Sequence, residues 1–243
     1  MKIFILQNYD ELSKKAFDIF KETITNISNP VIGFATGTTP IGLYELLIEA
    51  YKNKELSFES VTTFNLDEYV GLKHTHHQSY AYFMHKYLFD NIDIKKENIN
   101  LLNGHSGDLS AECNRYNALL NDNQIDLQIL GLGSNGHIGF NEPGTSFSST
   151  THVVNLKDST IKDNSRLFDN CDDVPRKAIT MGIKNIMNAK RILLLVSGKN
   201  KTQAIYKFFV DDISEELPCS ILKKHNDVYV LLDVDAASLI LKK

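Results

Sequence analysis

The stretch VIGFATGTTPIGLYELL, residues 31–47, contains one complete structural unit of the chain. Val31–Ala35 is a short apolar run without alternation, which predicts a strand buried on both faces. Thr36–Thr39 then forms a glycine-containing turn, Pro40 suits the first turn of a helix, and apolar residues recur three or four positions apart afterwards. The stretch therefore predicts a β-strand that runs directly into an α-helix.

The same alternation of short apolar runs and helical patterns continues along the rest of the chain. Six further runs predict strands: Ile3–Leu6, Val61–Leu66, Ile99–Leu102, Leu127–Leu132, Ile192–Val196 and Val228–Leu232. Because several of these runs are apolar almost throughout, they are typical of a parallel sheet covered on both faces. We therefore expect one α/β domain over residues 1–243, built on an open, doubly wound, mostly parallel, Rossmann-like sheet with helices on both faces.

The composition is that of an ordinary globular protein, with 42% hydrophobic and 23% charged residues and a net charge of −4. This charge offers no general attraction for nucleic acid or anionic membranes. The apolar runs are far shorter than the roughly 20 residues of a membrane-spanning helix, and the N-terminus lacks a signal-peptide pattern. The three cysteines have no zinc-motif spacing. We expect buried free thiols, no nucleic-acid or membrane partner, and a cytoplasmic location.

The turn Thr36–Thr39 has the features of an anion-binding loop. Gly37 lets the backbone approach a ligand closely, while the first N–H groups of the helix and the hydroxyls of Thr36, Thr38 and Thr39 can contact a phosphate. No Lys-Ser or Lys-Thr pair follows, so the stretch is not a P-loop. By itself, an ordinary strand-to-helix turn with threonine caps explains these residues equally well.

A second segment, TFNLDEYVGL over residues 63–72, ends an apolar strand in two adjacent carboxylates. Because neighbouring residues of an extended chain point to opposite faces, only one of Asp67 and Glu68 can face a ligand. A carboxylate held above a substrate can remove a carbon-bound proton when its pKa suits that step. Asp67 is thus a candidate base, with a solvated acidic loop as the simpler alternative.

The third segment, GLGSNGHIGFNEPG over residues 131–144, holds five of the 13 glycines. It contains a G-x-G-x-x-G match, but no helix follows and the strand lies mid-chain, so we do not expect NAD to bind. We expect the glycines to give this loop backbone freedom. The loop presents His137 and Glu142, which can act as a general acid/base pair in which the carboxylate favours the protonated imidazole.

Two basic residues complete the candidate site. Lys201 follows a predicted strand, at the carboxyl edge of the sheet where the threonine loop also lies. Arg166 lies in a long polar stretch, where an ordinary surface charge is the simpler interpretation. His74, His76 and His77 lack the further ligands that a first-row metal requires, so we expect a solvated loop there and no metal site.

Four motifs together resemble the glucosamine-6-phosphate deaminase family: GFATGTTPIGLYELL, TFNLDEYVGL, GLGSNGHIGFNEPG, and NSRLF followed by VSGKNK. The likeness extends over nearly the whole chain, and the order and strand-end placement of the motifs are more specific than any one of them. The resemblance implies that glucosamine 6-phosphate is isomerised and deaminated to fructose 6-phosphate and ammonia, without a cofactor.

The resemblance also implies a role for each matching residue. Asp67 would move the proton between C-2 and C-1 of the open-chain sugar, and His137 would open the ring, oriented by Asn135 and Glu142. The implied phosphate-binding residues are Thr36, Gly37, Thr38, Thr39, Arg166 and Lys201. Residues 152–181 match the family's mobile lid.

The chain departs from the family in two places. Asn135 stands where many members have Asp, so we expect Glu142 to supply most of the support for a protonated His137. The residues 151–154 include no Arg or Lys where the hexameric members bind an acetylated sugar phosphate, and their longer C-terminal tail is lacking. We therefore expect hyperbolic kinetics and a monomer or small homo-oligomer.

Other activities fit parts of the same pattern. A 6-phosphogluconolactonase-like hydrolase would bind a similar phosphosugar, but lactone hydrolysis does not call for Asp67. A galactosamine-6-phosphate deaminase would differ in the orientation of one substrate hydroxyl, which the sequence does not resolve. A sugar-phosphate-sensing regulator would need a DNA-reading module, for which the chain has neither a helix-turn-helix pattern nor spare length.

Overall fold

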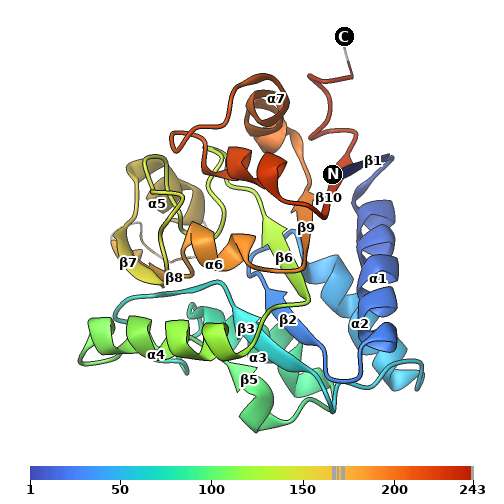
Figure 1. Ribbon diagram of the computed structural model, residues 1–243, viewed down its shortest axis with the longest axis vertical. Coiled ribbons are helices and arrows are strands. Elements are labelled where there is room, and N and C mark those ends of the chain that lie inside the picture. The colour runs from blue at the N-terminus through green and yellow to red at the C-terminus, as the bar shows by residue number, and fades with distance from the viewer. Residues whose placement is uncertain (166–167, 169, 171–172, 242–243) are drawn as a thin grey trace.

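The computed structural model describes residues 1–165, 168, 170 and 173–241. A seven-stranded sheet runs through the molecule in the order β1-β10-β9-β6-β2-β3-β5 (Figure 1). Its strands are β1 (Lys2–Leu6), β2 (Val31–Phe34), β3 (Thr62–Asn65), β5 (Ile99–Asn100), β6 (Leu127–Gly131), β9 (Arg191–Val196) and β10 (Val228–Asp233). All neighbouring strands are parallel. The predicted sheet is confirmed, with one strand at each of the seven predicted places.

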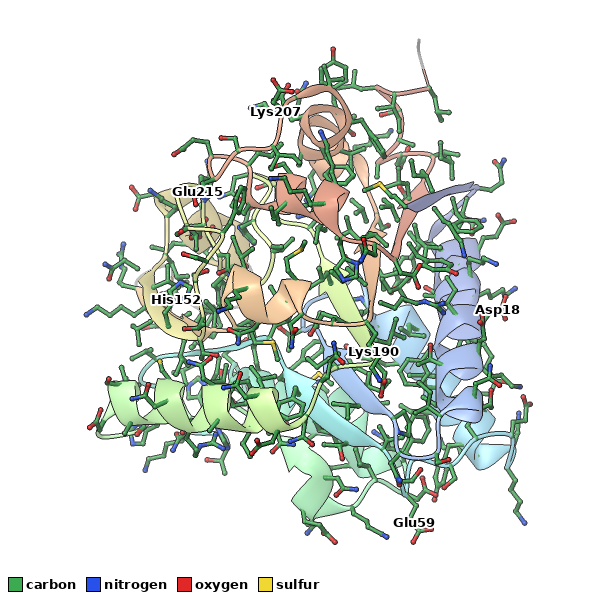
Figure 2. The ribbon with its side chains drawn as sticks, in the orientation of Figure 1. Asp18, Glu59, His152, Lys190, Lys207 and Glu215 are labelled. Carbon is green, nitrogen blue, oxygen red and sulfur yellow. The ribbon has the colours of Figure 1, made fainter. Side chains whose placement is uncertain are left out.

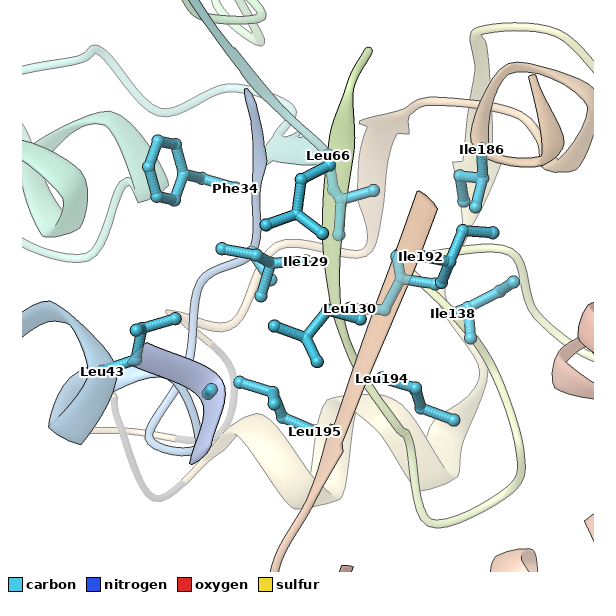
Figure 3. Close-up of a cluster of buried hydrophobic side chains, with 14 of the residues drawn as sticks. Phe34, Leu43, Leu66, Ile129, Leu130, Ile138, Ile186, Ile192, Leu194 and Leu195 are labelled. Atoms are coloured by element: carbon cyan, nitrogen blue, oxygen red, sulfur yellow. The ribbon is translucent and has the colours of Figure 1, made fainter. Parts of the chain in front are cut away.

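The central strands are buried on both faces. Every residue of β10, and every residue of β9 except its first, is buried. Figure 3 shows apolar side chains packed around the central strands, including Phe34, Leu43, Ile129, Leu130, Ile192, Leu194 and Leu195. A strand covered on both sides must be apolar at nearly every position, which is why unbroken apolar runs predicted these strands correctly.

Helices cover both faces of the sheet. On one side α1 (Tyr9–Asn26) packs against α2 (Ile41–Lys52), and α4 (Leu109–Asp122) and α6 (Ile183–Met187) lie on the opposite side (Figure 1). The remaining helices are α3 (Tyr80–Tyr87), α5 (Asp158–Ser165) and α7 (Thr202–Val210), with 3₁₀ turns η1 (Phe89–Asn91), η2 (Lys96–Asn98), η4 (Lys199–Lys201) and η5 (Pro218–Lys224). None of the described helices is long and apolar enough to cross a membrane.

Charged side chains of both signs are spread over the outside of the molecule. Asp18, Glu59, Lys207 and Glu215, which are exposed, project from different sides of the fold (Figure 2). Two of the three cysteines, Cys113 and Cys219, are buried free thiols as expected, while Cys171 lies outside the described residues.

The strand order reverses between β2 and β6, near the centre of the sheet. From β2 the chain continues outward through β3 to β5, whereas from β6 it continues in the other direction through β9 to β10. Loops that leave two such strands diverge and open a crevice at the carboxyl edge. The threonine loop, Asp67, the glycine-rich loop and Lys201 follow β2, β3, β6 and β9, which are four adjacent strands.

The sequence patterns do not predict a second, antiparallel sheet of three short strands. Its order is β4 (Asp67–Tyr69), β8 (Lys177–Thr180) and β7 (His152–Asn155), and Asp67 lies opposite Thr180. The sheet joins the strand that begins with Asp67 to both ends of the segment 152–181. A separate apolar cluster fills the space beneath it, formed by Tyr69, Phe140, Leu156, Ile161, Val174 and Ala178.

Candidate active site

A cavity of about 410 Å³ lies at the carboxyl edge of the sheet, where the strand order reverses. Its walls include the loop Thr36–Thr39 after β2, Asp67 after β3, His137 after β6, and Lys201 in η4 after β9. Segments that are up to 165 residues apart in the chain thus meet because their strands are neighbours in the sheet. The cavity offers the carboxylates of Asp67 and Asp163, one imidazole, one ammonium and a loop of hydroxyl and N–H donors.

The threonine loop owes its shape to Gly37, which has a φ of +100°. A side chain at this position would be strained, because L residues rarely adopt this region of backbone conformation. The loop is held from outside by Tyr9, whose hydroxyl donates to the carbonyl of Thr38 at 3.1 Å and accepts from the N–H of Gly42 at 2.7 Å. Pro40 is the residue that precedes the first helical residue of α2, one position earlier than the sequence predicts.

Asp67 and Glu68 point to opposite faces of β4, as predicted. Asp67 faces the cavity, whereas the carboxylate of Glu68 turns away and accepts the backbone N–H groups of Tyr69, Tyr80 and Ala81 at 2.8–2.9 Å. Burial raises the pKa of the Asp67 carboxyl well above its usual range, and the negative charge of Glu68 adds to the effect. Asp67 therefore combines access to the cavity with the high basicity that a proton-abstracting carboxylate needs.

His137 lies in the cavity wall with Glu142 behind it. The Nδ1 atom of His137 is 3.6 Å from Oε2 of Glu142, and the two side chains are 18% and 2% exposed. Burial would raise the pKa of the Glu142 carboxyl, but its interactions with His137 and with Asn135 outweigh burial and lower that pKa to about 2. Glu142 is thus ionised at neutral pH, and its negative charge lies beside the imidazole of His137.

Asn135 does not contact the imidazole. Its Oδ1 accepts the backbone N–H of His137 at 3.1 Å, and its Nδ2 donates to Oε2 of Glu142 at 2.8 Å. In this structure the hydrogen bonds of the Asn135 amide thus go to the backbone of His137 and to Glu142. Asn135 instead fixes the backbone of the loop and holds the carboxylate in place, while Glu142 faces the ring.

Gly133 makes room for the imidazole of His137. A Cβ atom at position 133 would overlap the Cε1, Nε2 and Cδ2 atoms of the ring, and the backbone φ at Gly133 is not in the left-handed region. Glycine at 133 is thus required for space, whereas Gly136, Gly139 and Gly144 have positive φ values between 56° and 92°. Our prediction of backbone freedom applies to these three glycines and not to Gly133.

Part of the segment 152–181 lines the cavity on one side. Helix α5 contributes Thr160, Asp163 and Asn164 to the wall. Two hydrogen bonds attach it to the rest of the site: Ser134 Oγ to Asp163 Oδ2 at 2.6 Å, and Asn164 Nδ2 to the hydroxyl of Tyr69 at 2.8 Å. Arg166, which the sequence places just after this helix, lies outside the described residues.

The sequence patterns missed an aromatic wall. Tyr80, at the start of α3, lines the cavity, and its ring stacks on that of Phe140 with an interplanar angle of 11° and centroids 5.8 Å apart. Tyr69 packs against both rings. The aromatic residues at 80–89 are typical of one helix and its core contacts, and no local pattern tells which aromatic residue of an amphipathic helix faces a cavity.

The three histidines of the loop before α3 lie apart from the cavity. His74 Nε2 is 2.9 Å from the carbonyl oxygen of Leu102, and the rings of His76 and His77 stack on each other. Across the part of the chain that the structure describes, no three His, Cys, Asp or Glu side chains gather as a metal site would require.

Comparison with known proteins covers nearly the whole chain. The family model described as glucosamine-6-phosphate isomerases/6-phosphogluconolactonase matches residues 7–230. The chain belongs to this family. A glucosamine-6-phosphate deaminase of Thermoanaerobacter sp. (strain X514) is 51% identical over 241 residues, covering 99% of this chain and 95% of the relative. One of Clostridium novyi (strain NT) is 52% identical over 239 residues, covering 98% and 99%.

Solved structures of the glucosamine-6-phosphate isomerase/6-phosphogluconolactonase family show the same fold. A monomeric glucosamine-6-phosphate deaminase aligns with a TM-score of 0.97 at 49% identity, covering 98% of this chain and 100% of the other. The 6-phosphogluconolactonase of Trypanosoma brucei aligns with a TM-score of 0.79 at 19% identity, covering 98% of each chain. The second likeness is one of fold alone.

Proposed function

We propose that this protein is an enzyme that converts glucosamine 6-phosphate and water to fructose 6-phosphate and ammonia, in amino sugar catabolism. The observation that carries the proposal is the cavity at the strand reversal, which places a buried carboxylate, a His–Glu pair and an anion-binding loop around one space. The relatives that are about 50% identical over the full chain, all named as glucosamine-6-phosphate deaminases, support the same substrate.

We assign the phosphate to the loop Thr36–Thr39 and to Lys201, with Arg166 as a further cationic partner from the lid. The loop offers backbone N–H groups and hydroxyls at a helix start, and Lys201 supplies a compensating charge from η4, the turn that follows β9. Phosphate binding would then fix the sugar with its reactive end directed along the cavity toward Asp67 and His137.

We assign the proton transfers to Asp67 and His137. His137 would take the proton of the C-1 hydroxyl and pass a proton to the ring oxygen, so that the pyranose opens to the aldehyde. Asp67 would then take the proton from C-2, whose acidity the neighbouring ammonium increases, and deliver a proton to C-1. The resulting C-2 imine adds water and loses ammonia, which leaves fructose 6-phosphate. No step requires an electron acceptor or a metal, and we propose that no cofactor takes part.

The lactonase alternative has the weaker support. Lactone hydrolysis needs activated water but no transfer of a carbon-bound proton, so a buried base of raised pKa has no task in it. Galactosamine 6-phosphate remains the closest competing substrate, since it differs only in the orientation of the C-4 hydroxyl. A side-by-side comparison of kcat/KM for the two amino sugar phosphates decides between them.

The proposal is tested by measuring ammonia release from glucosamine 6-phosphate by the wild type and by Asp67→Asn. The substitution keeps the size of the side chain and removes the base, so we expect kcat to fall about 10²–10⁴-fold. The matched control is Asp126→Asn, because Asp126 is buried to the same degree but lies at the opposite end of the sheet. Equal activity of Asp67→Asn and wild type, or acid release from 6-phosphogluconolactone in place of ammonia release, would refute the proposal.

For the assembly and location we propose a monomer or small homo-oligomer in the cytoplasm. The similar solved structure of a monomeric deaminase supports a site that works within one chain. The partner we propose is the phosphosugar alone, with no nucleic acid and no membrane.

A further inference from the structure

Asp233 is a buried carboxylate at the carboxyl end of β10 that does not line the cavity. Its two oxygens accept the hydroxyl of Ser197 at 2.6 Å, the N–H of Gly198 at 3.0 and 3.1 Å, and the N–H of Ala236 at 2.7 Å. The side chain is 6% exposed. A buried carboxylate with this many donors is well compensated, so its position is strongly determined.

Two of the three groups that Asp233 holds belong to the turn that carries the phosphate-binding lysine. Ser197 lines the cavity, and Gly198, with a φ of +94°, turns the chain from β9 into η4. The N–H of Lys201 donates to the carbonyl of Gly198 at 3.1 Å, so the backbone of Lys201 is fixed relative to the residue that Asp233 holds. Hydrogen bonds to Asp233 of the neighbouring strand β10 therefore fix the position of this turn, and its own sequence does not.

A second contact between the same two segments lies next to the first. The hydroxyl of Thr202 lies 2.7 Å from the carbonyl oxygen of Lys199 and 3.1 Å from that of Asp235, and it can donate its one proton to either. The segment 197–202 thus contacts the end of β10 at both of its ends, with Lys201 between the two contacts. The geometry resembles the outer hydrogen bonds that orient a binding residue without touching the ligand.

The direction of the hydrogen bonds also limits what the turn offers to a ligand. Ser197 gives its proton to Asp233, and Gly198 gives its N–H to the same carboxylate. The Ser197 oxygen can therefore only accept hydrogen bonds from the cavity side. On this side of the cavity, the positive charge of Lys201 remains the feature that suits an anion.

We propose that Asp233 is a positioning residue for the phosphate subsite, acting through the Ser197–Gly198 turn on Lys201. This inference depends on the proposed function in one respect, namely that the ligand is a phosphosugar. Because the reacting atoms lie at the other end of the substrate, loss of Asp233 should weaken binding of the phosphate and leave the proton transfers unchanged.

The test compares Asp233→Asn with Asp126→Asn. The amide cannot accept on both sides, so it leaves at least one donor of the turn unpaired. Asp126 is likewise 6% exposed and accepts Val31 N–H at 2.8 Å and Lys190 Nζ at 2.7 Å, but it lies at the amino end of the sheet. Both variants lose a buried charged hydrogen-bond acceptor, and only one of them adjoins the cavity.

For Asp233→Asn we expect KM for glucosamine 6-phosphate and Ki for inorganic phosphate to rise together, about 5- to 20-fold, with kcat within about twofold of wild type. For Asp126→Asn both constants should stay at the wild-type values even if the melting temperature falls. A milder variant, Ser197→Ala, removes one hydrogen bond and should raise both constants about 2- to 3-fold, which keeps the inference testable if Asp233→Asn does not fold.

Direct binding of inorganic phosphate, measured by titration calorimetry, separates this inference from the proposed function. If the wild type binds phosphate but releases no ammonia, and Asp233→Asn still weakens phosphate binding, the proposed function fails and the positioning role stands. If Asp233→Asn melts at a lower temperature but binds phosphate as the wild type does, Asp233 is merely structural and the inference is overturned.

Discussion

At the scale of single residues, Gly133 shows that a glycine-rich loop serves more than one need. The imidazole of His137 lies directly over the Cα atom of Gly133, where any Cβ would overlap the ring. The left-handed backbone occurs elsewhere in the loop, at Gly136, Gly139 and Gly144. The sequence alone does not distinguish these glycines from one another, because the distance between Gly133 and the ring of His137 is determined only when the loop folds.

We predict that Gly133→Ala lowers kcat about 10- to 100-fold without unfolding the protein, since the new methyl group must displace the catalytic imidazole. Ammonia release measures the loss, and circular dichroism checks the fold. Gly107→Ala is the matched control, because a Cβ at position 107 meets no atom within 4 Å and the backbone φ there is ordinary. Wild-type kcat in Gly133→Ala would show that the ring does not depend on this space.

The residues around His137 show which contacts of the candidate site can be predicted from the sequence and which cannot. Alternation along the strand correctly separated Asp67 from Glu68, because the two faces of an extended chain are fixed by its geometry. Hydrogen bonding within the loop could not be predicted in the same way. Asn135 could reach the ring or the backbone of His137, and the fold selects the backbone.

At the scale of secondary-structure elements, burial determines which strands can be predicted from the sequence. The parallel strands β6, β9 and β10 are buried on both faces and are mostly apolar, whereas the edge strand β1 is largely exposed. The three strands of the second sheet have only three or four residues each, DEY, HVVN and KAIT, with mixed polarity. They are strands because of their pairing with one another across the fold, which no local pattern encodes.

Glu68 joins two of these elements. Its carboxylate accepts the N–H groups of Tyr80 and Ala81, so it lies at the amino end of α3, where the helix dipole favours a negative charge. The same residue sits next to Asp67 on β4. Glu68 thereby connects the strand of the candidate base with the helix whose first residue, Tyr80, lines the cavity.

We predict that Glu68→Gln moves the acid limb of the kcat profile to lower pH. Burial first, and then the charge of Glu68, raise the pKa of Asp67, and the base works only when ionised. Removing the neighbouring negative charge therefore lowers the pKa of Asp67 and lets it ionise at lower pH, although burial keeps that pKa above its usual range. The other titratable groups beside Asp67, Tyr69 and Tyr80, have raised pKa values and stay neutral throughout.

The measurement is kcat against pH for the wild type, Glu68→Gln and Glu112→Gln. Glu112 is also a buried carboxylate near a helix start, where it accepts the N–H of Asn103 at 2.8 Å, but it does not contribute to the pKa of Asp67. Its variant should keep the wild-type limb. An unchanged limb in Glu68→Gln, or a limb moved to higher pH, would contradict the electrostatic role.

At the scale of the whole molecule, the cavity and its cover belong to one chain. The segment 152–181 has its own apolar cluster against Tyr69 and Phe140 of the same chain, so its inner face needs no second subunit for burial. We propose that this segment is a lid, whose closure within one chain would couple each site only to its own ligand. This arrangement favours independent sites.

We therefore predict hyperbolic substrate saturation, with a Hill coefficient of about 1, and no activation by N-acetylglucosamine 6-phosphate. Initial rates of ammonia release across a range of substrate concentrations, with and without that sugar phosphate, test the kinetics. Sedimentation equilibrium at the assay concentration gives the state of assembly. A sigmoidal curve that becomes hyperbolic when the acetylated sugar is added would disprove the prediction.

The pairing of β1 with β10 has a consequence for the way the chain folds during its synthesis. The first strand of the chain, Lys2–Leu6, has its only sheet neighbour among the described residues in the last strand, Val228–Asp233. At about 5–20 residues per second, the ribosome takes on the order of 10–50 seconds to make the chain between them. Throughout that time Ile3 and Phe4 have no strand to pair with, so this short apolar run is an early target for chaperones and for aggregation.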